Sequence, residues 1–228
     1  MLASVHMADL GPRRTLATVT KRKSQLVAPG LRSAQLAFAA RLGGSLFTKP
    51  IVGRAALIAF WDDDAALDRF LADSPLAQTF AGGWQVRLEP LRAWGSWPGL
   101  PEDLPKARNV EHAGPVAVLT MGRTRVNRLP AFLLASGKAE AQLAGAAGLM
   151  WASALVRPPF VATCSLWEST DASREYAFTA GHAHNDAIAA GRAKPFHHQE
   201  AFIRFRPYGS VGHLDGRNPL AESILAGV

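Results

Sequence analysis

The sequence lacks the features that define several large classes of protein. Its 228 residues include a single cysteine, Cys164, so no intramolecular disulfide can form and a reducing compartment is expected. The motifs G-x-G-x-x-G, Walker A, G-x-S-x-G, C-x-x-C and H-E-x-x-H are also missing. Nucleotide-dependent chemistry, serine hydrolysis and a thiolate zinc site therefore have no support in the sequence.

Long hydrophobic runs are missing as well. The most apolar stretch, residues 143–156, is shorter than the roughly 20 residues that a membrane-spanning helix needs, and it contains Gly145 and Gly148. Residues 1–13 contain Asp9 and no sustained apolar region, so they do not resemble a signal peptide. These features predict a cytoplasmic protein without a transmembrane helix.

The charge of the chain is positive but is not arranged in blocks. There are 25 Lys and Arg residues against 18 Asp and Glu residues, a net charge of +7, and only Lys21-Arg22-Lys23 forms a run. No nucleic-acid-binding motif and no interleaving of aromatic with basic residues accompanies the charge, so nucleic acid is not expected as a partner. An anionic membrane surface and an acidic partner protein fit the charge equally well.

What is present is a pattern of predicted elements that occurs twice. An apolar strand ends in tryptophan at Trp61 and again at Trp167, and polar residues that can cap a helix follow each time, at 62–64 and 168–171. A strand and a helix precede each of these strands, and a final strand follows each capped helix. The predicted strands are residues 15–20, 54–61, 84–91, 116–121, 160–167 and 196–206, and the predicted helices are residues 31–42, 65–72, 76–80 and 129–144.

Two βαββαβ units in tandem predict an α+β fold, in which two ferredoxin-like halves form an α/β barrel within one chain. The predicted boundaries are residues 14–93 for the first half, 94–115 for a proline-rich linker, 116–208 for the second half and 209–228 for a C-terminal tail. The second half is the longer one between its tryptophan and its last strand. Because the additional residues include several histidines, we expect the functional site in this half.

Four of the seven histidines lie between residues 178 and 205. If residues 184–192 form a helix, His184 shares one face with Ala187 and Ile188, and this face is expected to be buried. A histidine on the inward face of a short helix can supply an axial nitrogen to a metal or a haem iron. The alternative is a core histidine that makes one hydrogen bond.

The strand expected after Pro195 has two different faces. Alternation assigns His198, Glu200, Phe202 and Arg204 to one face, and His197, Gln199, Ala201, Ile203 and Phe205 to the other. One face therefore combines a histidine, a carboxylate, an aromatic ring and a guanidinium. Since neighbouring histidines point to opposite sides, a three-histidine metal centre would need a ligand from outside this segment.

Seven short segments together resemble one known family. They are FTKP at 47–50, LEPLRAWGSWPG at 88–99, GPVAVLT at 114–120, CSLWESTDA at 164–172, GHAHNDAI at 181–188, FHHQEAFIRF at 196–205 and DGRNPL at 215–220. In this order, over residues 36–225, the sequence resembles the acyclic carotenoid (spheroidene) monooxygenase family. The resemblance implies a haem-dependent oxygenase that acts on long apolar polyenes.

The resemblance also implies a set of site residues. Related barrels hold haem with a histidine from a helix of the second half, and His184 matches this position, with Ile188 and Phe202 expected to contact the cofactor. Arg204 or Arg125 is expected to polarise bound dioxygen or to hold a haem propionate. The implied partners are an apolar substrate and an electron donor protein. The rival interpretation is a haem-free dimeric α/β-barrel oxygenase or a small-molecule binding module.

Overall fold

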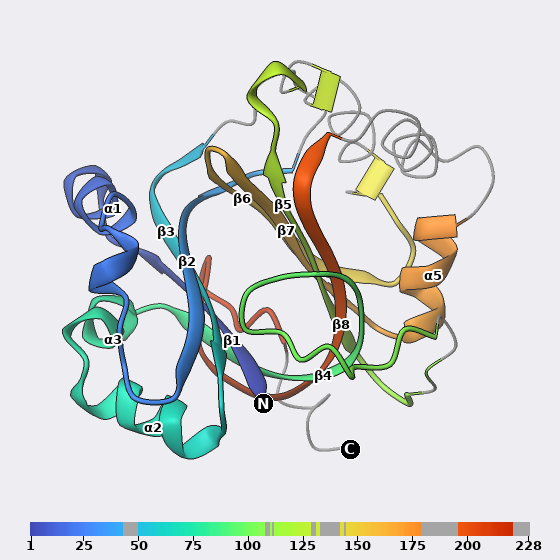
Figure 1. Ribbon diagram of the computed structural model, residues 1–228, viewed down its shortest axis with the longest axis horizontal. Coiled ribbons are helices and arrows are strands. Elements are labelled where there is room, and N and C mark those ends of the chain that lie inside the picture. Colours follow the sequence, from blue (N-terminus) through green and yellow to red (C-terminus); the bar gives the residue numbers. More distant parts are fainter. Residues whose placement is uncertain are drawn as a thin grey trace.

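The computed structural model is a closed antiparallel barrel with helices on two sides (Figure 1). It describes residues 1–42, 50–107, 110, 112–128, 131–132, 142–143, 145–178 and 196–220. The strands are β1 (Leu2–Asp9), β2 (Leu31–Ala40), β3 (Pro50–Trp61), β4 (Trp84–Gly95), β5 (Val116–Thr124), β6 (Leu149–Arg157), β7 (Phe160–Trp167) and β8 (His197–Gly212). The helices are α1 (Pro12–Val19), α2 (Asp64–Asp73), α3 (Pro75–Phe80) and α5 (Thr170–Phe178), with short 3₁₀ turns at Lys23–Gln25 and Val126–Arg128.

The strand order confirms the predicted fold class. The barrel runs β1-β3-β2-β6-β7-β5-β8-β4 and closes where β4 meets β1. Each half contributes four neighbouring strands in the same order, β4-β1-β3-β2 in the first half and β8-β5-β7-β6 in the second. The chain is therefore two ferredoxin-like units joined edge to edge, at β2 with β6 and at β4 with β8.

Two predicted elements of the first half are wrong. Residues 15–20, predicted as a strand, belong to helix α1, whose buried residues Thr15, Thr18 and Val19 have helical spacing. Residues 31–42, predicted as a helix, form strand β2. This strand is covered on both faces, with Ala37 and Ala39 inside the barrel and Leu36 outside it, so it lacks the polar alternation that reveals a strand.

The first half still begins with a strand followed by a helix, as predicted, because β1 is that strand and α1 is that helix. Both lie earlier in the sequence than predicted. Strand β1 begins before residue 14, where the first half was expected to begin. At the other end, β8 continues past residue 208 to Gly212, and Leu214 and Leu220 are buried in the barrel interior. Arg54 holds this last segment, because its guanidinium pairs with Asp215 at 2.6 Å and with Asp9 at 2.8 Å.

The remaining predicted elements that lie in the described residues are confirmed. Asp63 caps α2 by accepting a hydrogen bond from the backbone N–H of Ala66 at 2.8 Å, and Ser169 accepts one from Ala172 at 3.1 Å at the start of α5. Figure 1 shows α1, α2 and α3 on one side of the barrel and α5 on the opposite side. The helices predicted at 129–144 and 184–192 lie largely or wholly outside the described residues.

The predicted linker crosses one end of the barrel. Its backbone N–H at Ser96 donates to the carbonyl of Glu200 in β8 at 2.9 Å, and the carbonyl of Pro98 accepts a hydrogen bond from Ser33 in β2 at 2.5 Å. Strands β2 and β8 are four places apart in the ring of eight, so the segment spans the full width of the barrel. Between these anchors Trp97 is only 4% exposed and packs into the interior, which closes this end.

Candidate functional site

The candidate site lies on the outer face of the second-half sheet. In β8, Ala201, Ile203 and Phe205 are fully buried in the barrel interior, so Phe202 and Arg204, which were predicted to share the other face of this strand, point outward. Helix α5 covers the neighbouring part of this face, where Trp167 packs beside Ala172 and Tyr176. Helix α5 therefore covers only part of this face, and Phe202 and Trp94 remain partly exposed.

Arg204 is a buried cation that forms no ion pair with the residues that the structure describes. The residue is 7% exposed, and its Nε and Nη1 atoms are buried without a hydrogen-bond partner in the part of the chain that the structure describes. Burial, and to a smaller extent the positive charges of Arg92 and Arg174, lower the pKa of Arg204 to about 10, against a smaller opposing effect of Asp171. Because a buried charge is costly unless it is paired, this position favours the binding of an anion.

An aromatic surface adjoins this cation. Phe202 is half-buried, and its ring centre lies 5.5 Å from that of Trp94, which is its neighbour across the β4–β8 pairing. Trp94 remains 47% exposed although it is a large ring. It was expected in a linker and is instead the next-to-last residue of β4. A flat apolar surface therefore lies beside a buried positive charge.

His197 is on the outer face, which corrects the prediction that it points away from Glu200. Its Nδ1 lies 3.1 Å from Oε2 of Glu200, and its ring rests on Gly122, where an added Cβ would lie 2.5 Å from Cδ2. The cause is a shift in the β5–β8 register between Arg123 and Thr124, since an irregularity of this kind turns the next side chain to the other face.

The His197–Glu200 pair leaves one imidazole nitrogen free to react. An ionised carboxylate only accepts hydrogen bonds, so Nδ1 donates to Glu200 and Nε2 keeps its lone pair. Nε2 is buried and has no hydrogen-bond partner among the described residues, and the ring of Phe132 lies 4.9 Å away. A carboxylate on one nitrogen and an unpartnered second nitrogen suit either a metal ligand or a proton carrier.

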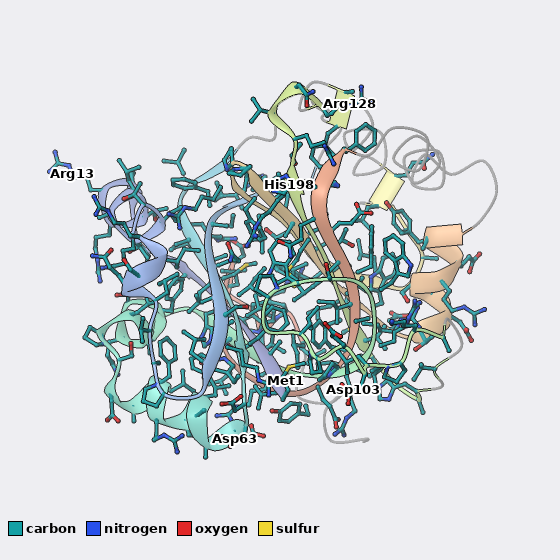
Figure 2. The ribbon with its side chains drawn as sticks, in the orientation of Figure 1. Met1, Arg13, Asp63, Asp103, Arg128 and His198 are labelled. Carbon is teal, nitrogen blue, oxygen red and sulfur yellow. The ribbon has the colours of Figure 1, made fainter. Side chains whose placement is uncertain are left out.

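Of the other predicted site residues, Arg125 lies beside His197 and far from Arg204. Arg125 is exposed and its Nε donates to the carbonyl of His197 at 3.3 Å, whereas Arg204 is seven residues, roughly 23 Å, further along β8. His184 and Ile188 lie outside the described residues. Figure 2 shows His198 near the same end of the barrel as Arg128, and His198 is exposed.

The described residues do not provide what a metal site of three protein ligands, a reactive thiol or a membrane-spanning helix requires. Within them, no three His, Cys, Asp or Glu side chains are grouped so that they could hold a metal ion. Burial in the barrel interior raises the pKa of the Cys164 thiol to about 12, so this thiol is inert at neutral pH. None of the described helices has the length and apolar character needed to cross a bilayer.

Comparison with curated proteins gives two informative relatives, whereas no family model matches the chain. The spheroidene monooxygenase of Rubrivivax gelatinosus is 34% identical over 199 residues, which covers 83% of this chain and 75% of that protein. The spheroidene monooxygenase of Cereibacter sphaeroides is 26% identical over 195 residues, which covers 83% of this chain but only 60% of that protein. The chain thus spans less than two thirds of the length of the second relative.

Among solved structures, an aldoxime dehydratase in complex with butyraldoxime superposes with a TM-score of 0.51 at 8% sequence identity, and the match covers 90% of this chain and 79% of that one. Since the identity is so low, this likeness shows a shared barrel fold and nothing about chemistry.

Proposed function

Because the chain belongs to the spheroidene monooxygenase family, we propose that it is a haem-dependent monooxygenase that acts on a long, apolar, carotenoid-type substrate. The proposed haem site is the outer face of the second-half sheet, with His184 as the ligand of the iron and Ile188 beside it. When bound, the haem would supply the iron at which dioxygen is activated.

The observation that carries this proposal is the unpaired, buried Arg204. An isolated buried cation costs several kcal/mol, and such a cost is expected where a ligand of opposite charge completes the site. Haem combines two carboxylates with a flat apolar ring. Arg204 would bind a carboxylate and the rings of Phe202 and Trp94 would contact an apolar plane, so the residues present fit this group.

His197 would carry protons at the other end of the same face, roughly 23 Å along β8 from Arg204. Its unpartnered Nε2 can accept a proton, and the carboxylate of Glu200 on Nδ1 would stabilise the imidazolium that results. Gly122 keeps the imidazole flat against β5 and thereby holds its orientation. Arg125, bonded to the carbonyl of His197, would position this residue rather than contact the substrate.

The proposed substrate class rests on the family relationship and on the free energy that is gained when a ligand buries apolar surface. Burying ~100 Å² of apolar surface, on the order of one isoprene unit, contributes about 2.5 kcal/mol, so a few such units suffice for micromolar binding after association costs. A monooxygenase reduces the second oxygen atom of dioxygen to water, so an electron donor protein is the further partner that we propose. A cytoplasmic location remains a prediction.

The proposal is tested by the absorption spectrum of protein produced with added haem. We expect a Soret band that His184→Ala weakens or abolishes and that the matched variant His182→Ala leaves in place, because a helix over residues 184–192, as predicted from the sequence, would put only residue 184 on the face of Ile188. Equal loss in both variants would remove His184 as the ligand. Colourless wild-type protein that still binds isoprenoid compounds would favour the haem-free binding module.

A further inference from the structure

We propose that the part of the first half around α1 docks on an anionic membrane surface. The evidence begins with the distribution of charge along the chain. Residues 10–61 contain no Asp or Glu, and their nine basic residues are Arg13, Arg14, Lys21, Arg22, Lys23, Arg32, Arg41, Lys49 and Arg54. Because the whole chain carries +7, the remaining residues together carry −2. The positive charge of the protein is therefore concentrated in one segment.

Several of these cations are free to meet a partner. Arg32 and Arg54 are already paired, with Asp62 and with Asp9 and Asp215 respectively. In contrast, the side chains of Arg13, Arg14, Lys21 and Arg22 are exposed, and none forms an ion pair with another described residue. Figure 2 shows Arg13 projecting into solvent from the edge of the molecule. Such a cluster attracts a negative surface over a distance of about 8–10 Å at physiological salt.

Apolar side chains are exposed beside these cations. Helix α1 packs on the barrel through Thr15, Thr18 and Val19, so Leu16 on its other side remains 56% exposed. Val52 is 79% exposed and adjoins the start of this helix, because the backbone N–H of Leu10 donates to the carbonyl of Gly53 at 2.7 Å. Exposed branched side chains among arginines are typical of a surface that enters the lipid headgroup layer.

The difference in charge between α1 and the neighbouring helix α2 determines which side of the molecule would face a membrane. Helix α2 in the same half carries Asp64, Asp68 and Asp73, and Figure 2 shows its cap residue Asp63 at a different corner of the molecule from Arg13. Since Asp64 and Asp68 are paired with Arg87, α2 has no excess of positive charge, and a negative membrane would attract the side of the molecule that carries α1, so one orientation is favoured. A nucleic acid or an acidic protein would satisfy the cations but would give Leu16 and Val52 no comparable apolar environment.

The purpose of this docking rests on the proposed function, since a long polyene partitions into lipid, but the surface itself does not depend on haem or substrate. We expect the purified protein to co-sediment with vesicles of phosphatidylcholine and phosphatidylglycerol and to be released by 0.5 M salt. Each basic residue near an anionic surface contributes about fivefold to binding, so the double variant Arg13→Gln/Arg14→Gln should bind about 25-fold more weakly. The double variant Leu16→Gln/Val52→Gln should also bind more weakly.

The matched control is Arg69→Gln, which removes an exposed arginine from α2 and should leave vesicle binding unchanged. Equal binding to vesicles of phosphatidylcholine alone, or equal loss in the control, would overturn the proposal. If heparin or polyglutamate bound as tightly and the Leu16/Val52 variant were unaffected, the surface would be a polyanion site instead. A normal Soret band in the Arg13/Arg14 variant would show that the haem site is intact, so failure of docking and failure of the proposed function are distinguishable.

Discussion

The unpaired guanidinium of Arg204 has opposite effects on stability and on binding. Burial and the nearby positive charges of Arg92 and Arg174 lower its pKa, so the charged form of this side chain costs free energy in the folded protein. No ion pair with another described residue offsets this cost, and a bound carboxylate would offset it. Residues of this kind destabilise the free protein and are retained for what they bind.

We therefore expect Arg204→Met to raise the free energy of unfolding of the haem-free protein by about 1–3 kcal/mol and to weaken haem binding. Urea unfolding and haem titration measure the two effects. The matched control is Arg206→Met, two residues along the same face, where the arginine already pairs with Glu89 on the surface and its removal should cost at most about 1 kcal/mol. If both variants lost stability and bound haem normally, Arg204 would have only a structural role.

The sequence was sufficient to place Arg204 but not His197. Strict alternation along β8 correctly assigned Phe202 and Arg204 to one face and Ala201, Ile203 and Phe205 to the other, and the structure shows that the first of these is the outer face. It failed at His197 because the register shift between Arg123 and Thr124 has no signature in residue type. One signal was available: Gly122 interrupts an apolar strand, and a glycine in a strand often marks a place where another group approaches the backbone closely.

At the scale of elements, predictions were reliable where a cap or a tryptophan marked the boundary. Strand β3 and helix α2 were recognised because an apolar run of strand length meets a group of aspartates. Helix α1 and strand β2 were exchanged because each lacks its usual pattern: α1 buries two threonines, and β2 is rich in alanine and buried on both faces. Periodicity cannot distinguish a strand that is buried on both faces from a helix.

The contact of strand β5 with the imidazole at the start of β8 can be tested by substitution. Gly122→Ala places a Cβ 2.5 Å from the ring of His197, so the ring must move and the bond to Glu200 is expected to break, at a cost of about 1–3 kcal/mol. The histidine resonances should shift in the NMR spectrum. The control Gly82→Ala, where a Cβ meets nothing within 4 Å, should change stability by less than about 1 kcal/mol. Identical behaviour of the two variants would contradict the described contact.

At the scale of the whole molecule, the duplication was visible in the sequence but its limits were not. The repeated tryptophan-terminated strand predicted two similar halves, and both halves have the same strand order. Long-range contacts, which the sequence does not reveal, link residues across the expected boundaries at 93/94 and 208/209. Asp215 contacts the first half through its ion pair with Arg54. Trp97 reaches the barrel interior because residues 96–98 cross from β8 to β2.

The two junctions between the halves differ in length. Among the described residues, β4 pairs with β8 over 11 residue pairs, from Trp84 to Gly95, whereas β2 pairs with β6 over only three, from Phe38 to Ala40. Partial opening of a protein begins where the fewest hydrogen bonds must break, so the barrel should open first between β2 and β6 and turn about the β4–β8 junction as a hinge. Amide hydrogen exchange should then be faster at residues 38–40 and 154–156 than along β4 and β8. Uniform protection of both junctions would mean that the barrel opens only by unfolding completely.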